Sequence, residues 1–392
     1  MKVGFIAWER FSYGGISRTI SSVINELSKD TDIKVLCLKD KKYFENVYNI
    51  DTTKVEFTFT ELTTIQKIRR EITNKIFEKY EITNNKFFLQ NLPKIKYAKS
   101  YLNKIINWIN SNNFDIVVFA SGFEDCIQLA AIKDKIKQCP KLVAWSHAGF
   151  TDYFREDYKI RSLNHQNLWK HFYKEFDAIV VLSDTDVTEC HKYLGLNATR
   201  IYNANSFSPN NRTNLNNKSF VYVGALSKTK GSDILIDAFV EFSKINKDWN
   251  LTFCGEGGIK EYIEEQILKY NLKSRVNLYN YTTDVESIYN KNDIFILPSR
   301  FEGFGIVQIE AASCGLPIIA SELAITKELV SKYNYGELFE YNNSSSLAKV
   351  MLSIIDKDLS YYSKNAFVAA KDFEISKISN EWRMLFKNLI NS

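Results

Sequence analysis

The sequence predicts an α/β protein built from two doubly wound domains of parallel sheet. Short runs of β-branched residues alternate with longer amphipathic stretches along almost the whole chain, which is typical of βα units that form parallel sheets. With 392 residues, the chain is too long for one compact core and long enough for two domains. Its 45% hydrophobic and 25% charged residues are typical of a folded protein rather than a disordered one.

The first half, residues 1–205, carries the strands of one predicted domain. These strands are expected near residues 2–7, 33–38, 115–120, 141–146, 178–182 and 199–202. The next segment, residues 206–217, contains Pro209 and five asparagines and has no regular periodicity. We interpret it as an interdomain linker.

The alternation resumes in the second half, residues 218–370. Strands are expected near residues 220–224, 251–254, 276–279, 293–298 and 317–320, with helices between them. In residues 371–392, large apolar residues such as Trp382 and Leu389 recur at helical spacing, which predicts a closing helix. One expected location for this helix is against the first domain.

Composition argues against several classes of protein. The longest apolar runs, such as residues 116–120 and 294–297, are far shorter than the roughly 20 residues of a membrane-spanning helix. The chain starts directly with a strand pattern and lacks the features of a signal peptide. We therefore expect a cytoplasmic protein, with peripheral contact at the inner face of the plasma membrane as an additional location.

Charge and cysteine content also limit the function. The formal net charge of +5 is mild, so nucleic-acid binding is not expected. The six cysteines are scattered without C-x-x-C spacing, so we expect mostly buried thiols rather than a zinc or redox site.

A basic insertion interrupts the first half between residues 67 and 104. It holds ten Lys or Arg and three Glu. Large apolar residues lie between these charges: Ile68, Ile72, Ile76, Phe77, Phe87, Phe88, Leu89, Ile95 and Tyr97. Two interpretations stay open, a pair of surface helices whose apolar stripe packs on the core, and a surface that docks on anionic lipid headgroups.

The strongest motif, residues 299–317, follows the predicted strand 293–298. A strand, a glycine-bearing loop and a helix together form a phosphate-binding arrangement, because the helix start offers free N–H groups and a positive dipole end. Gly303 and Gly305 allow close backbone approach. Glu302 and Glu310 place two carboxylates near one ligand, and carboxylates accept hydrogen bonds from sugar hydroxyls. The alternative is that Glu302 is a loop charge and Glu310 an exposed helix residue.

This stretch resembles the E-x7-E signature of the retaining glycosyltransferase family 4, and the likeness covers nearly the whole chain. The resemblance implies the GT-B fold, in which two Rossmann-like domains face a cleft. It also implies that Glu302 faces the donor sugar and Glu310 binds the nucleotide ribose. The amides of Phe304, Gly305 and Ile306 would hold the diphosphate and the sugar.

A second segment, residues 223–231, is similar to the family's G-R-L-x-x-x-K-G pattern. Lys230 matches the lysine that neutralises the leaving diphosphate, and a cation there would stabilise negative charge as it develops. Ala225 stands in place of the family's arginine, and Lys228 is a candidate substitute. The alternative for Lys230 is a solvated lysine at a helix start.

Weaker likenesses complete the expected donor site in the second half. Residues 255–258 resemble the family's G-x-G turn. The loop 279–284 occupies the place where the family holds the base, so Tyr281 and Thr282 are candidates for donor binding.

In the first half, Gly14 and Gly15 open a helix and resemble the family's glycine pair, which faces the donor diphosphate; Arg18 lies in the first turn of that helix. A simple β-to-α turn is the alternative. His147 ends a strand where the family often has a histidine near the sugar, and a structural histidine is the alternative. Closure of the domains would bring both features against the donor and exclude water.

One motif points to metal binding but is interpreted differently. Asp184-Thr185-Asp186 matches the D-x-D metal site of the other large glycosyltransferase fold. It follows a strand and precedes a helix, so we interpret Ser183 or Asp184 as a helix N-cap with a first-turn acid. We expect no metal site and no cofactor.

The resemblance implies transfer of a hexose or N-acetylhexosamine from a UDP-sugar to a glycan acceptor, with retention of configuration. A lipid-linked acceptor in surface polysaccharide or capsule biosynthesis is expected because of the basic insertion. Two alternatives remain, a hydrolysing UDP-sugar 2-epimerase and a catalytically silent partner of another transferase. The sugar, the linkage and the oligomeric state are not predicted.

Overall fold

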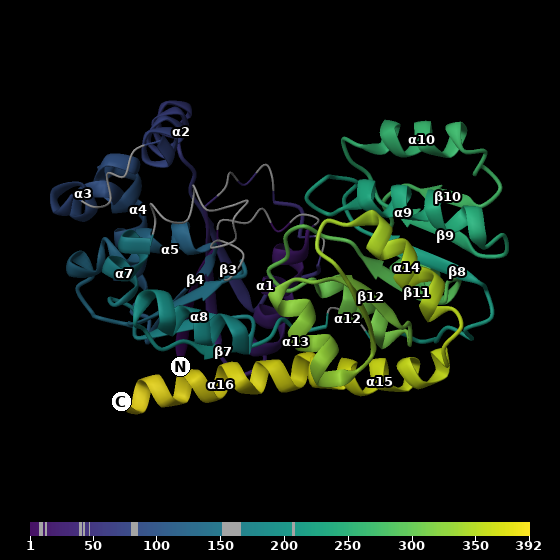
Figure 1. Ribbon diagram of the computed structural model, residues 1–392. Helices are drawn as coiled ribbons and strands as arrows, with labels where there is room; N and C mark the ends of the chain where they lie inside the picture. The colour runs from purple at the N-terminus through teal and green to yellow at the C-terminus, as the bar shows by residue number, and fades with distance from the viewer. Residues whose placement is uncertain are drawn as a thin grey trace. The chain divides into compact units, whose positions relative to one another are not determined.

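The computed structural model describes residues 1–7, 11, 14–38, 41, 44–46, 48–79, 85–150, 166–205 and 208–392. The chain divides into two compact units. Unit 1 comprises Met1–Ala204 and Ile375–Ser392, and unit 2 comprises Asn205–Glu374. Each unit is a sheet covered by helices (Figure 1).

Unit 1 has a seven-stranded parallel sheet within the described ranges, with strand order β3-β2-β1-β4-β5-β6-β7. Its strands are β1 (Lys2–Ala7), β2 (Asp32–Cys37), β3 (Val55–Phe59), β4 (Ile116–Ser121), β5 (Lys141–Ser146), β6 (Ala178–Val181) and β7 (Thr199–Arg200). Its helices are α1 (Gly15–Leu27), α2 (Thr64–Lys79), α3 (Lys86–Lys96), α4 (Lys99–Asn112), α5 (Phe123–Ala130), the 3₁₀ helix η3 (Lys133–Lys135), α7 (Gln166–Tyr173), α8 (Asp184–Leu194) and α16 (Ile375–Asn391).

Helices cover both faces of this sheet, because side chains alternate between the faces of each strand. On one face, Ile6, Phe119 and Leu142 share a core cluster with α4, α5 and α7. On the other, Trp145 contacts Trp382 of α16 with ring centroids 4.7 Å apart. Unit 1 is therefore doubly wound, as predicted.

Unit 2 has a six-stranded parallel sheet, counted over residues 208–374, with strand order β10-β9-β8-β11-β12-β13. Its strands are β8 (Ser219–Val223), β9 (Asn250–Cys254), β10 (Val276–Tyr279), β11 (Ile294–Leu297), β12 (Ile318–Ser321) and β13 (Gly336–Phe339). Its helices are α9 (Ser232–Ile245), α10 (Lys260–Lys269), α11 (Val285–Asn290), α12 (Ile306–Ser313), α13 (Ala324–Tyr333), α14 (Ser344–Ile354) and α15 (Leu359–Asp372).

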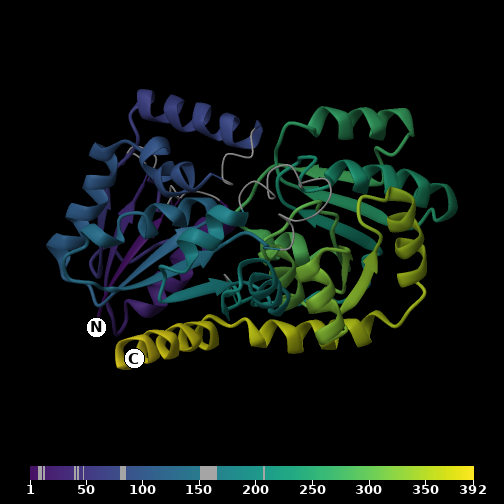
Figure 2. The ribbon, with the colours of Figure 1, turned by 60° about the vertical axis from the view of Figure 1, so that its left-hand side comes forward.

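Helices also lie on both faces of the second sheet. One face joins α9 and α14 in a core cluster through Phe220, Phe253 and Ile296. On the opposite face, Phe295 of β11 contacts Tyr289 of α11 with ring centroids 6.0 Å apart. Figure 2 gives a second view of these layers. The predicted α/β class with two doubly wound sheets is confirmed.

The structure adds two strands that the sequence analysis missed, β3 and β13. Both lie at the edge of their sheets. An edge strand has a neighbour on one side only, and β3 carries polar residues between apolar ones (Val-Glu-Phe-Thr-Phe). Such a strand lacks the continuous apolar run by which buried parallel strands are recognised.

Two segments differ in detail from the prediction. In the segment interpreted as a linker, the backbone amides of Asn210 and Asn211 donate to Glu286 at 2.7 and 2.8 Å, so its described part belongs to unit 2. The predicted closing helix 371–392 is present as α16, which begins later than predicted, at Ile375, because Lys371 and Asp372 form the end of α15.

The described part of the chain contains no helix that is long and apolar enough to cross a membrane.

Five of the six cysteines are buried and Cys139 is exposed, which agrees with the expectation of mostly buried thiols.

Candidate active site

The loop between β11 and α12 has the backbone geometry of an anion site. Gly305 caps α12 in a left-handed conformation, with φ 71° and ψ 54°. A Cβ at this position would lie 2.9 Å from Nε2 of Gln308, which already donates to the carbonyl of Phe304 at 2.8 Å. Within the described residues, the N-cap Gly305 provides no side-chain cap for α12, and a helix start that its N-cap side chain leaves open can bind an anion.

Glu302 lies in this loop and is only 6% exposed. One of its oxygens, Oε1, accepts hydrogen bonds from Ser299 Oγ at 2.8 Å and from Lys230 Nζ at 2.7 Å. The Lys230 side chain is 37% exposed. Its ammonium group is therefore partly accessible to solvent while it pairs with a buried carboxylate. The structure thus brings together Glu302 and Lys230. Glu302 is a buried, paired carboxylate rather than a free loop charge, whereas Lys230 stays partly exposed just before α9.

Gly231 explains how Lys230 reaches Glu302. Its φ is 69°, and a Cβ there would lie 1.8 Å from the carbonyl oxygen of Pro298. Only glycine allows the backbone before α9 to lie this close to the end of β11. The two loops are therefore in direct contact.

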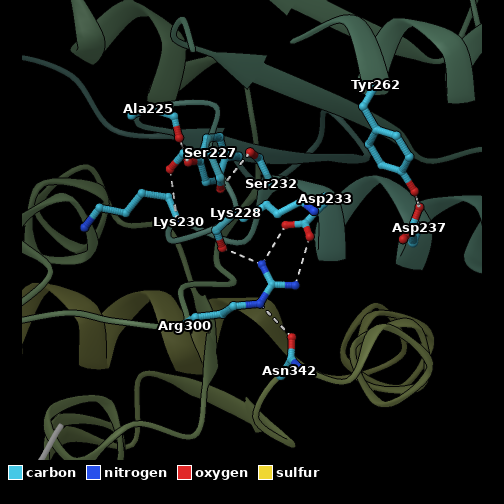
Figure 3. A network of polar contacts seen from close by, with 11 residues as sticks. Ala225, Ser227, Lys228, Lys230, Ser232, Asp233, Asp237, Tyr262, Arg300 and Asn342 are labelled. Atoms are coloured by element: carbon cyan, nitrogen blue, oxygen red, sulfur yellow. Dashed lines mark hydrogen bonds and ion pairs between the residues drawn. The ribbon is translucent and has the colours of Figure 1, made fainter. Parts of the chain in front are cut away.

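Arg300 connects the same two loops through side-chain hydrogen bonds (Figure 3). The sequence analysis did not identify it. Its Nη1 and Nη2 donate to the two carboxylate oxygens of Asp233 at 2.8 and 2.9 Å. Nη1 also donates to the carbonyl of Lys228, and Nε donates to Asn342 Oδ1 at 2.7 Å. A bidentate arginine–carboxylate pair fixes orientation as well as distance, so Arg300 positions the segment that carries Lys230.

Glu310 lies on α12 and is fully buried. The hydroxyl of Tyr289 donates to its Oε2 at 3.4 Å. The alternative of an exposed helix residue is therefore wrong. Tyr289 itself carries no sequence signal that ties it to Glu310, because it comes from a different helix, α11.

The remaining candidates of unit 2 lie in surface loops. Lys228 and Ala225 are exposed, and the carbonyl of Ala225 accepts a hydrogen bond from Tyr222 at 2.6 Å. Tyr281 is 43% exposed, and Thr282 Oγ1 accepts from the backbone amide of Asp284 at 3.1 Å. Gly303 precedes the capping glycine in the β11–α12 loop.

The G-x-G turn after β9 has a packing role. A Cβ on Gly255 would lie 1.9 Å from the carbonyl oxygen of Gly224, and one on Gly257 would lie 2.2 Å from that of Leu226. The turn therefore needs glycine to lie against the β8–α9 loop, whose far end carries Lys230.

Gly14, Gly15 and Arg18 lie together at the start of α1 in unit 1. The amide of Gly14 donates to the hydroxyl of Tyr48 at 2.9 Å, and the guanidinium of Arg18 lies 5.5 Å from the centroid of the same ring. Tyr48, which the sequence analysis did not single out, thus contacts two of the three candidates, Gly14 and Arg18.

His147 follows β5 in unit 1 and is 6% exposed. Its ring lies 4.3 Å from that of Trp145, and burial lowers its pKa to about 3. Among the described residues, neither ring nitrogen of His147 has a hydrogen-bond partner. His147 is therefore a neutral imidazole at physiological pH, with a donor and an acceptor to offer.

The buried His147 should make stability depend on pH. Its folded pKa of about 3 lies below the ordinary histidine value of 6.5, so between these two pH values the unfolded chain binds a proton that the folded chain does not. The contribution of the neutral His147 to the free energy of unfolding is complete above pH 6.5 and is lost as pH falls towards 3. Between these values, the free energy of unfolding should change with a slope approaching about 1.4 kcal/mol per pH unit. Urea unfolding between pH 7 and 4.5 should show this slope in the wild type and lose it in His147→Gln. The matched variant of the exposed His191, His191→Gln, should keep it.

The D-x-D motif is a helix start, as interpreted. The Ser183 side chain accepts from the amide of Asp186 at 2.9 Å, which makes it the N-cap of α8. Asp184 pairs with Arg200 at 3.1 Å, whereas Asp186 accepts from the amide of Phe150 at 2.6 Å. Across the described ranges, no group of three or more His, Cys, Asp or Glu side chains could hold a metal ion.

Family comparisons agree with this fold and site. The profile of glycosyl transferases group 1 matches residues 204–368, and that of glycosyltransferase family 4 matches residues 13–204. Between them, the two profiles account for most of both units. The chain is a glycosyltransferase with the GT-B fold.

Individual relatives match over most of the chain. An uncharacterized glycosyltransferase of Haemophilus influenzae is 26% identical over 388 residues, covering 97% of this chain and 99% of the relative. The O-antigen biosynthesis glycosyltransferase WclY of Escherichia coli is 25% identical over 290 residues, covering 70% of this chain and 80% of WclY.

Solved structures share the fold at low identity. HepE of Anabaena in complex with UDP and glucose superposes with a TM-score of 0.72 at 17% identity and covers 99% of both chains. Sucrose-phosphate synthase of Thermosynechococcus elongatus superposes with a TM-score of 0.74 at 15% identity, covering 100% of this chain and 99% of the other.

Proposed function

We propose that this glycosyltransferase moves a hexose or N-acetylhexosamine from a UDP-sugar to a glycan acceptor, with retention of configuration. The observation that carries the proposal is the contact of Lys230 with the buried Glu302 beside the uncapped start of α12. This arrangement offers a cation and backbone amides to a diphosphate, and a carboxylate to the hydroxyls of a sugar. The solved complex of HepE with UDP and glucose supports the choice of UDP.

The proposed reaction runs on one face of the sugar. The bond between the anomeric carbon and the diphosphate oxygen breaks, and a bond from the same carbon to the acceptor oxygen forms. The acceptor proton passes to the leaving diphosphate, whose charge Lys230 and the amides of Phe304, Gly305 and Ile306 stabilise. Glu302 orients the sugar, and Glu310 binds the ribose.

The other candidates take supporting roles in this proposal. Gly303 lets the backbone approach the donor, Lys228 adds positive charge, and Tyr281 with Thr282 borders the base. In unit 1, we assign His147 to the sugar and Gly14, Gly15 and Arg18 to the diphosphate. Because Lys230 and the helix start supply positive charge, the chemistry needs no metal ion and no cofactor.

We assign the acceptor to surface polysaccharide biosynthesis, where WclY acts in O-antigen biosynthesis. A relative in Campylobacter jejuni, 28% identical over 43% of this chain, transfers N-acetylgalactosamine to a diphospho-undecaprenol-linked sugar. A lipid-linked acceptor would place the reaction at a membrane surface, with residues 67–104 against anionic headgroups at the inner face of the plasma membrane.

Donor binding is tested first by thermal shift with UDP, GDP, ADP and several UDP-sugars. Ligand at about 100 times its dissociation constant should stabilise the wild type by about 2.7 kcal/mol, a shift of a few degrees. Glu310→Ala should lose the shift with UDP because the ribose loses its carboxylate. The matched variant Glu264→Ala, at an exposed position of α10, should keep it.

The same panel separates the alternatives. A UDP-sugar that stabilises the wild type is then incubated with acceptor, and release of UDP with a new glycosidic bond supports the transferase. Release of UDP with a free 2-epimeric sugar would support a hydrolysing epimerase instead. Absence of any nucleotide shift in the wild type would contradict the donor site and support a silent partner protein.

A further inference from the structure

The start of helix α1 in unit 1 is bound by a tyrosine from a loop further along the chain. The hydroxyl of Tyr48 accepts a hydrogen bond from the backbone amide of Gly14 at 2.9 Å and donates to the carbonyl of the same residue at 3.2 Å. Gly14 is the N-cap residue of α1 and, as a glycine, has no side chain that could cap the helix. Tyr48 therefore fixes a backbone position that glycine by itself leaves variable.

The aromatic ring of Tyr48 contacts the basic side chain in the first turn of α1. The guanidinium carbon of Arg18 lies 5.5 Å from the centroid of this ring, within the range of a cation–π interaction. The backbone amide of Arg18 donates to the carbonyl of Gly14 at 3.0 Å. One tyrosine thus contacts both the backbone at the helix start and the cation that lies beside it.

The loop that carries Tyr48 is itself attached to α1. Asn25, in the last part of this helix, donates through Nδ2 to the carbonyl of Asn49 at 3.2 Å. Its Oδ1 accepts from the backbone amide of Asp51 at 3.1 Å. Asn49 has a φ of 52°, which is the left-handed conformation that asparagine adopts more readily than most residues. These contacts present Tyr48 to the start of the helix in a defined position.

The groups that Tyr48 holds are all favourable to an anion. The start of a helix offers backbone amides and the positive end of the dipole, and Arg18 adds a full positive charge. Gly14 and Gly15 are exposed, so these groups are accessible. A glycine turn and a long arginine side chain both lose conformational freedom when they bind a ligand. A residue that holds them in place beforehand reduces this entropic cost and so strengthens binding.

We propose that Tyr48 is a positioning residue for the diphosphate of the nucleotide-sugar donor. It acts through Gly14 and Arg18, which it holds in the geometry that binds the anion. The inference rests on the proposed function, because that proposal assigns the start of α1 and Arg18 to the donor diphosphate. A purely structural role for Tyr48 would instead affect the stability of unit 1 and would not distinguish ligands with and without phosphate.

Binding of UDP and of uridine to the full-length protein tests the proposal, by calorimetry and by ligand-observed NMR. Tyr48→Phe removes the hydroxyl and keeps the ring, and it should weaken UDP binding about three- to tenfold. Tyr48→Leu removes both contacts and should weaken UDP binding at least about tenfold. Uridine has no diphosphate, so its affinity should be the same in wild type and in both variants. The control Tyr270→Phe changes a tyrosine of unit 2 that is 40% exposed and should bind both ligands as the wild type does.

A double-mutant cycle tests whether Tyr48 acts through Arg18. Tyr48→Leu and Arg18→Ala are measured singly and together for their effect on UDP binding. Because each single substitution removes the same cation–π contact, the loss in the double variant should be smaller than the product of the two single losses. Losses that multiply would show that Tyr48 and Arg18 act independently and would overturn this part of the proposal.

The remaining outcomes separate this inference from the proposed function. Normal UDP binding by Tyr48→Leu, with loss of UDP binding in Glu310→Ala, would overturn the role of Tyr48 and leave the donor site standing. Equal weakening of UDP and uridine, with a lowered melting temperature, would assign Tyr48 to the stability of unit 1 alone. A wild type that does not bind UDP would overturn both proposals.

Discussion

Replacing Lys230 by alanine is expected to lower kcat/KM for the UDP-sugar by about 100- to 1000-fold. The loss has two physical causes. In the proposed reaction, the leaving diphosphate loses the cation that we assign to its developing charge. The buried Glu302 also loses a partner that lies 2.7 Å away. Lys230→Arg keeps the charge and should recover part of the activity. Steady-state assays of UDP release, with melting temperatures to check folding, measure both effects.

Lys228 supplies the matched comparison, because it lies two residues away in the same loop. Its side chain is exposed, where a charge is screened by solvent, so Lys228→Ala should cost less than about tenfold. A loss equal to that of Lys230→Ala would mean that Lys228 replaces the arginine absent at Ala225. If Lys230→Ala retained full activity, the assignment of Lys230 to the diphosphate would be wrong.

Replacing Trp382 by alanine is expected to destabilise unit 1 by about 3–5 kcal/mol. Trp382 is fully buried on α16, with ring centroids 4.7 Å from Trp145 and 5.6 Å from Phe386. Its removal leaves a large cavity between α16 and the sheet. The unfolding transition of unit 1 should fall by about 10 °C, measured by differential scanning calorimetry.

Met384 provides the control on the same helix. Its side chain is 65% exposed, so Met384→Ala should change the melting temperature by about 1 °C or less. An equally small effect of Trp382→Ala would show that α16 does not stabilise unit 1.

The strands were predictable because a buried parallel strand needs a short, continuous apolar run. The residues of β4 (Ile-Val-Val-Phe-Ala-Ser) and β11 (Ile-Phe-Ile-Leu) are all buried, and such runs are visible in the sequence. The edge strands β3 and β13 lack this property. Their pairing depends on which neighbour the fold offers, and that information is not local.

The candidate site was predictable to the extent that its chemistry is local. Glycines, two glutamates and a lysine form a pattern that resembles one enzyme family. The glycines, Glu302 and Lys230 lie in adjoining loops of unit 2, and Glu310 lies on α12. Arg300 was missed because its partners, Asp233 and Asn342, are distant in sequence, and an arginine after a strand has no distinctive pattern. Tyr289 was missed for the same reason.

Taken by itself, the sequence determined the α/β class, the two sheets, the glycine-bearing loop and the resemblance to a glycosyltransferase family, because periodicity and backbone-specific residues act over a few positions. Only the tertiary structure decided that α16 packs on unit 1, that Lys230 contacts Glu302 across 72 positions of sequence, and that the isoleucines of α2 point away from the core. These outcomes depend on which surfaces compete for each side chain. A helical period predicts that one face is apolar, but the surrounding fold decides what that face meets.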